Sequence, residues 1–143
     1  MKKRELLLIA LSPAKGEFHT PVQVQKLIFL IESNISEYLG GRHFKFKPYH
    51  YGPFDKNVYE ELRGLAEEGY VDIVETQGWS SYRLTAKGQK EGDKLFKSLE
   101  KEDIRKYIKD VSEFVRSLSF TDLVAAIYKA YPEMRKNSVF ISQ

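Results

Sequence analysis

An alternating segment of aromatic and cationic residues in the first half of the chain constrains the fold most. In an extended strand, Phe44 and Phe46 point to one face, which we expect to be buried. The opposite face then carries His43, Lys45 and Lys47. The pattern predicts a strand with one apolar and one basic face.

An aromatic run that contains Gly-Pro follows directly, at residues 49–54. Gly52-Pro53 can continue neither a strand nor a helix, so we expect a rigid corner there. Asp55 is a good N-cap for a new helix, and Phe54 and Tyr59 occupy the two positions of a hydrophobic staple. The sequence thus predicts a strand, a corner and a helix start in close succession.

The length of 143 residues fits one domain with a sizeable core. We expect residues 1–99 to form the core and residues 100–143 to add a helical extension. No run approaches the ~18 apolar residues of a membrane span, and Glu5 interrupts the signal-like N-terminus. We therefore expect a short first helix, a cytoplasmic protein and no membrane partner. Cysteine is absent, which excludes disulfides and thiol nucleophiles.

Helix start signals are clear in the second segment. Thr20 at N-cap, Pro21 at N1 and Gln23 at N3 form a capping box. An apolar stripe follows at helical spacing, and Gly40-Gly41 ends it. Its members are Val24, Leu27, Ile28, Ile31, Ile35 and Tyr38.

The next elements predict a helix, a hairpin and three more helices. A helix over residues 55–68 leads to strands at 70–75 and 80–84, and Thr85 caps the helix after them. Residues 103–118 carry the most regular apolar helical pattern, which includes Phe114, and residue 119 opens a final helix. This order predicts a mainly helical α+β fold, a winged-helix-like domain with a small β-hairpin wing and additional C-terminal helices.

Three segments resemble the Panacea domain family, which includes SocA-like antitoxins, and the related YwgA-like proteins. Residues 24–30 are similar to the family's early "QKLLY" helix, and residues 49–54 with the following helix to its aromatic-x-Tyr-Gly-Pro segment. Residues 128–134 look YwgA-like. The resemblance implies a non-enzymatic binding domain that neutralises a toxin or acts as an adaptor.

The sequence offers no catalytic, cofactor or metal site. His19, His43 and His50 lack the spacing of metal ligands, and no glycine-rich loop precedes a helix to hold a phosphate. The paired glutamates on the helix at 55–68 are typical of a solvated face. We therefore expect no enzymatic activity and no cofactor.

DNA binding is the alternative function, because a winged-helix layout accompanies a basic strand face at Arg42, His43, Lys45 and Lys47. However, the helix in the recognition position carries five acidic residues against two basic ones, a net charge of −3 over residues 55–68. An acidic helix is repelled by DNA phosphates. The wing tip over residues 76–81 contains neither Lys nor Arg. These features favour a protein partner over DNA.

Aromatic side chains are the candidate anchors for a protein partner, which could be a toxin. Tyr49, Tyr51, Phe54 and Trp79 qualify, because aromatic residues dominate binding hot spots. A core position is the competing interpretation for Tyr51 and Phe54. The helix over residues 103–118 could pack on its own domain or form a homodimer.

Overall fold

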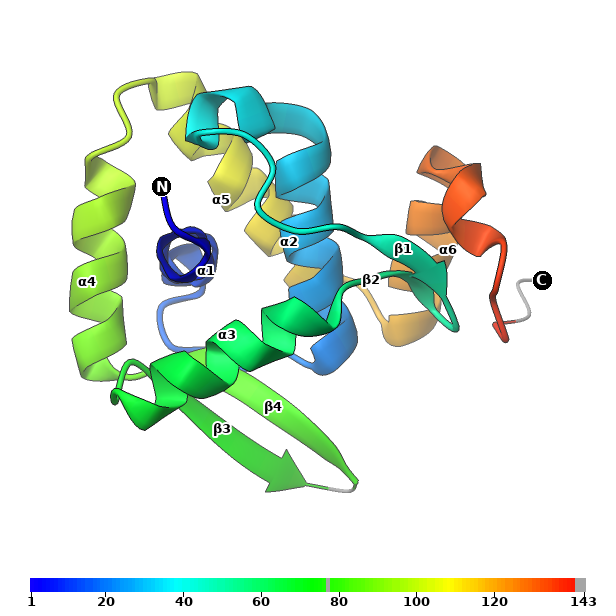
Figure 1. The fold of residues 1–143 in the computed structure, drawn as a ribbon, viewed down its shortest axis with the longest axis horizontal. Helices are drawn as coiled ribbons and strands as arrows, with labels where there is room; N and C mark the ends of the chain where they lie inside the picture. The colour runs from blue at the N-terminus through cyan, green and yellow to red at the C-terminus, as the bar shows by residue number, and fades with distance from the viewer. Residues whose placement is uncertain (77, 141–143) are drawn as a thin grey trace.

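The computed structural model describes residues 1–76 and 78–140, with the side chain of residue 76 excepted. It is a mainly helical α+β fold (Figure 1). The α-helices are α1 (Lys3–Leu11), α2 (Pro21–Ile35), α3 (Lys56–Glu67), α4 (Ala86–Lys97), α5 (Glu102–Ser117) and α6 (Phe120–Ala130). The 3₁₀-helices are η1 (Ser12–Ala14), η2 (Ser36–Leu39) and η3 (Pro132–Arg135). The strands are β1 (Lys47–Tyr49), β2 (Gly52–Phe54), β3 (Val71–Thr76) and β4 (Trp79–Leu84).

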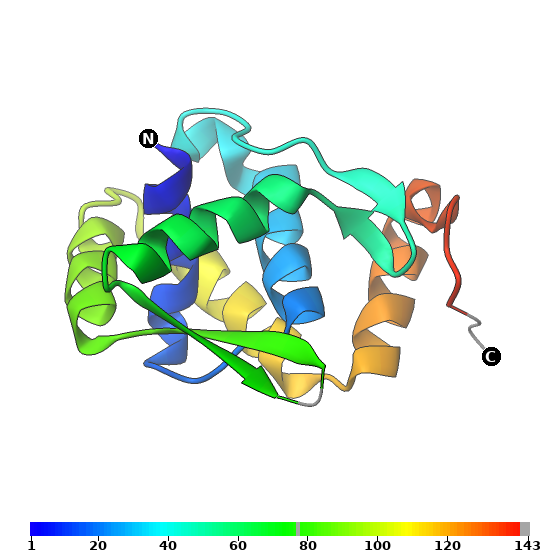
Figure 2. The same ribbon diagram turned by 60° about the horizontal axis from the view of Figure 1, so that its bottom comes forward.

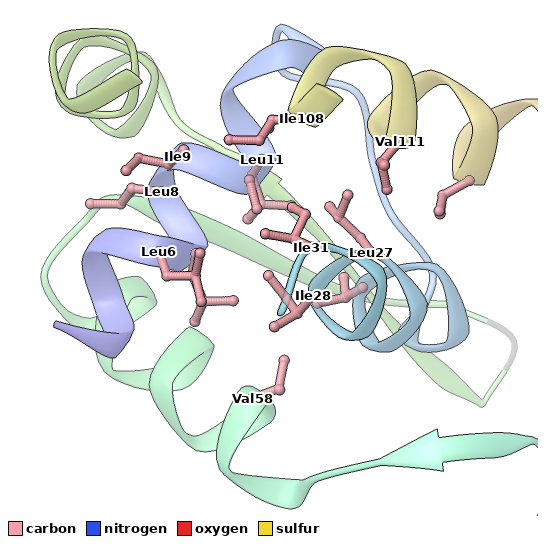
Figure 3. Packing of buried hydrophobic residues seen from close by; sticks show 14 of the residues in the cluster. Leu6, Leu8, Ile9, Leu11, Leu27, Ile28, Ile31, Val58, Ile108 and Val111 are labelled. Atoms are coloured by element: carbon pink, nitrogen blue, oxygen red, sulfur yellow. The ribbon is translucent and has the colours of Figure 1, made fainter. Parts of the chain in front are cut away.

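Helix α1 is the centre of the hydrophobic core. Every residue from Leu6 to Leu11 is buried, as expected for a helix that is apolar on all sides. Figures 1 and 3 show α1 surrounded by α2, α3, α4 and α5. Isoleucine and valine side chains of α5 join the leucines of α1 and α2, so the predicted C-terminal extension packs on this same core.

Helix α2 begins as predicted but ends earlier. The Thr20 hydroxyl accepts a hydrogen bond from the Gln23 amide, and Gln23 returns one to the Thr20 amide, which confirms the capping box. The α-helix stops at Ile35 and η2 follows. Because a 3₁₀ turn has about 3.0 residues, it rotates Tyr38 out of the apolar stripe. Tyr38 is exposed, contrary to the expectation from the periodicity.

The hairpin β3–β4 forms the predicted wing, with Val71 opposite Leu84 and Thr76 opposite Trp79. A single bridge pairs His19 with Tyr82 and adds a third strand position between α1 and α2. The order α1, bridge, α2, α3, β3, β4 is the layout of a winged helix (Figure 2).

The strand prediction for residues 43–47 is wrong. Residues 43–46 belong to no strand, and β1 begins only at Lys47. Gly52-Pro53, expected to break regular structure, lies inside β2, where Pro53 is opposite Pro48. This two-stranded ribbon has only edge strands, which tolerate proline. Gly52 supplies the positive φ of 105° that the tight turn requires.

Helix α5 buries the apolar stripe that predicted it, with Phe114 as the exception. Ile104, Ile108, Val111 and Val115 lie in the chain's own core, whereas Phe114 is exposed. Most of the apolar stripe is thus used within the chain, and the homodimer through residues 103–118 stays a prediction. Among the described helices, none is long and apolar enough to cross a membrane.

Candidate functional site

Buried polar side chains of α2 fasten residues 43–55 to the core. The Gln25 amide nitrogen donates to the Asp55 carbonyl (2.9 Å), and the Asp55 amide donates to the Gln25 carbonyl oxygen (3.1 Å). Lys26 Nζ donates to the Pro53 carbonyl at 3.2 Å. The two segments that carry the family resemblance therefore contact each other directly.

Glu32 fastens the other end of the same segment. Its buried carboxylate accepts hydrogen bonds from the backbone amides of His43 (2.6 Å) and Phe44 (2.9 Å). His43 Nδ1 also lies 3.1 Å from Glu32 Oε2, and only 8% of the His43 side chain is exposed. His43 was predicted on the basic face, and it does line the basic groove with Lys45 and Lys47, but its contact with Glu32 leaves its side chain mostly buried.

Asp55 caps α3 as predicted and also holds the preceding segment. One carboxylate oxygen accepts the Asn57 amide (2.9 Å) and the other accepts the Lys45 amide (2.7 Å). The staple partners Phe54 and Tyr59 have ring centroids 5.8 Å apart. These contacts fix the angle at which the β1–β2 hairpin leaves α3.

The C-terminal segment supports the outer edge of this hairpin. The Val139 amide donates to the His50 carbonyl (2.9 Å), and Asn137 Nδ2 donates to the Pro48 carbonyl (3.2 Å). The Tyr128 hydroxyl lies 2.7 Å from Ser138 Oγ. These hydrogen bonds hold the β1–β2 hairpin, which carries the aromatic residues, against the C-terminal segment.

An apolar groove of about 470 Å³ lies beside the hairpin, with rim aromatics from three separate elements. Tyr51 comes from the β1–β2 turn, Trp79 from the wing, and Phe120 from the start of α6. The rings of Tyr51 and Phe120 pack edge to face at 5.1 Å. The other lining residues are Thr20, Pro21, Val22, Gln23, Leu118 and Leu123.

The four predicted anchors fall into two groups. Tyr51 and Trp79 line the apolar groove and are 42% and 44% exposed. Tyr49 and Phe54 stack on each other at 5.0 Å outside that groove, and Phe54 is only half-buried. Tyr51 and Phe54 are thus not core residues.

Phe120 was missed as a binding candidate, although it is 46% exposed at the rim. The sequence feature that could have identified Phe120 is its position directly after the N-cap Ser119, whose hydroxyl accepts a hydrogen bond from the Asp122 amide. An apolar residue at this first helical position lies outside the buried stripe of α6, which consists of Leu123, Val124, Ile127 and Tyr128.

A basic groove of about 580 Å³ is formed by the β1–β2 hairpin, the segment before it and the start of α3. Lys3, Lys45, Lys47 and Lys56 line it, together with the predicted His43, the stacked pair described above and other residues. Arg42, predicted for this face, is exposed but is not part of the lining. The sequence therefore identified only two of the four lysines that meet here.

Helix α3, in the recognition position of the winged helix, presents a mainly acidic surface. Glu60, Glu67 and Glu68 are exposed on and just after it, against two exposed cations, Lys56 and Arg63. Glu68 also pairs with Arg4 at 2.6 Å. This surface is unfavourable for entry into a DNA groove.

The three histidines have separate structural surroundings. His19 is buried, and burial lowers its pKa to about 4, so its ring is neutral. His50 stacks on Tyr49 at 4.2 Å. Within residues 1–76 and 78–140, no group of three His, Cys, Asp or Glu side chains could hold a metal ion.

No protein-family model matches this chain, and no curated protein matches it. The Panacea resemblance therefore stays a prediction from the residues quoted above.

Proposed function

We propose that this chain is a non-enzymatic, protein-binding regulatory module of the Panacea type, a toxin neutraliser or an adaptor. The observation that carries the proposal is the apolar groove, where three exposed aromatic side chains converge from the hairpin, the wing and α6. Exposed apolar patches of this kind mark protein interaction sites.

The rim aromatics offer enough area for binding. Tyr51, Trp79 and Phe120 are 42–46% exposed, which leaves roughly 250 Å² to cover if each side chain has ~200 Å² in all. At ~25 cal/mol per Å² this is worth about 6 kcal/mol before the costs of association. Rim residues of this size act as hot spots, and so the groove can anchor a protein segment.

Charge defines the partner further. The basic groove, with its four lysines, shares no lining residue with the apolar groove, and the β1–β2 hairpin and its turn contribute residues to both. A partner that covers both surfaces needs apolar side chains for one and acidic side chains for the other. We infer that the occupant is a protein segment that carries both kinds of side chain.

A site-specific crosslinker tests this proposal. Photoreactive benzoylphenylalanine would replace Trp79 or Phe120 and, as a matched control, the exposed Phe114 of α5. We expect positions 79 and 120 to crosslink one and the same protein, and the addition of unlabelled chain to compete for it. Equal crosslinking from position 114, or no common product from 79 and 120, would refute the groove as the binding surface.

The second candidate function is DNA binding, favoured by the position of the basic groove at the start of α3. A DNA titration at two salt concentrations decides between the two functions, because phosphate contacts make affinity fall steeply with salt. A steep salt dependence that disappears in the Lys45→Ala/Lys47→Ala variant would support DNA binding and count against the protein-binding proposal.

A further inference from the structure

A second, smaller pocket adjoins the apolar groove and shares Pro21, Val22 and Tyr51 with it. Its volume is about 240 Å³. The remaining lining residues are mostly aromatic or apolar and include one lysine: Gln25, Lys26, Tyr49, His50, Gly52, Phe54 and Tyr59.

Lys26 is unusual because it is a buried cation without a counter-ion. It is 2% exposed, and its ammonium group, which has three donors, makes one hydrogen bond of 3.2 Å to the Pro53 carbonyl. None of the ion pairs in the described part of the chain includes Lys26. Burial lowers its pKa to about 7. An uncompensated buried charge is costly, and an incoming anion would relieve that cost.

Fastening the backbone does not by itself require a lysine here. The neighbouring Gln25 holds Asp55 through two hydrogen bonds with a neutral amide. Lys26 makes one contact with Pro53 and places its Nζ next to Gly52, where an added Cβ would come within 3.4 Å of it. Its charge thus lies next to a lining residue of an otherwise mostly apolar pocket.

We propose that this pocket binds a carboxylate, the side chain of an aspartate or glutamate on the partner segment, with Lys26 as its counter-charge. The inference rests on the proposed function and adds an acidic anchor residue to the partner. The aromatic walls cover the carbons that bear the carboxylate, and Lys26 Nζ donates its remaining hydrogen bonds to the carboxylate oxygens.

The pH dependence follows from the state of Lys26. The carboxylate binds the protonated amine, so its affinity falls as pH rises above about 7. The other titratable groups that face the pocket are Tyr49, His50, Tyr51 and Tyr59, and Tyr128 lies behind Gly52. His50 is the only histidine of the lining, and a His50→Gln variant separates its contribution from that of Lys26.

Two small probes of nearly equal shape test the site on the whole chain. The affinities of 3-phenylpropionate and its neutral amide, 3-phenylpropionamide, would be measured by NMR at pH 6 and pH 8.5, with the backbone amide resonance of Gly52 as reporter in every variant. At pH 6 we expect the acid to bind roughly tenfold more tightly than the amide. This preference should shrink at pH 8.5, disappear in Lys26→Met and persist in Lys90→Met, which replaces an exposed lysine of α4.

Equal affinity of the two probes in the wild type, or no binding of either, would overturn the carboxylate site even if Lys26→Met did not fold. A preference that survives in Lys26→Met or is lost in Lys90→Met would also overturn the role of Lys26. The crosslinking experiment at Trp79 and Phe120 does not depend on these probes. Failure of the pocket and failure of the groove are therefore distinguishable.

Discussion

Replacing Lys26 with methionine should stabilise the protein at acidic pH, although lysine hydrogen-bonds the backbone. Methionine keeps the unbranched stem and removes the ammonium group that the fold buries at 2% exposure. The variant loses the hydrogen bond that Lys26 donates to the Pro53 carbonyl, which is worth about 1 kcal/mol. The balance therefore depends on the cost of burying the charge.

The lowered pKa of Lys26 sets that cost. The unfolded chain keeps the proton up to about pH 10.5, whereas the folded chain releases it near pH 7. Between these values the unfolded state binds more protons, so the free energy of unfolding rises with pH. At pH 6 the full penalty is about 5 kcal/mol, and by pH 9 the wild type has recovered about 3 kcal/mol of it. Lys26→Met should thus be more stable by several kcal/mol at pH 6, with an advantage that shrinks as pH rises.

Urea denaturation of both proteins from pH 6 to pH 9 measures this difference, and other titrating groups cancel in the comparison. Lys47→Met, on the exposed β1 strand, is the matched control and should show no pH-dependent difference. A constant difference between wild type and Lys26→Met across this range would refute the burial argument.

Three further substitutions, the first with a matched control, test other parts of the fold. Gly52→Ala should lower the free energy of unfolding by about 2 kcal/mol, because φ is 105° and a Cβ would lie 3.3 Å from Tyr128. Gly64→Ala, with no atom within 4 Å of the added Cβ, should be neutral or stabilising in the same thermal melts, and equal effects of the two would contradict the strain argument. From pH 6.5 down to about 4, the wild type should lose about 3 kcal/mol relative to His19→Leu, since native His19 has its pKa lowered to about 4 and the unfolded chain binds the proton first. Parallel pH profiles in chemical denaturation would exclude this effect. Glu32→Gln should lower the free energy of unfolding by about 2 kcal/mol, because the two carboxylate oxygens each accept a backbone amide and glutamine replaces one of these oxygens with an NH₂ donor. An unchanged urea midpoint would show that these hydrogen bonds contribute little.

Local chemistry made the helix starts predictable. Thr20, Asp55, Thr85 and Ser119 each accept the backbone hydrogen bond expected of an N-cap. The wing followed from two short strands around a turn. These signals lie within a few residues of each other, and so a single sequence carries them.

The attachment of residues 43–55 to α2 could not be predicted in this way. Gln25, Lys26 and Glu32 occupy polar positions between the apolar residues of α2, and polar residues normally face solvent. Their hydrogen bonds reach backbone groups 11 to 30 residues away and leave no periodic signal. Only the family resemblance pointed to residues 24–30 and 49–54 together.

The candidate site was predicted in part. Tyr51 and Trp79 were identified by residue type, but their meeting with Phe120 depends on the packing of α6 beside the hairpin. The third strand position at His19 was missed because one bridge gives no alternating pattern.

The most direct test of the protein-binding groove is a calorimetric titration of the crosslinked protein, once purified, with three forms of this chain. Phe120→Ser removes a rim aromatic, and Phe114→Ser removes a matched exposed aromatic of α5. We expect Phe120→Ser to bind roughly 30-fold more weakly than the wild type, and Phe114→Ser to bind like the wild type. Equal affinities for all three would contradict the assignment of the groove as the binding surface.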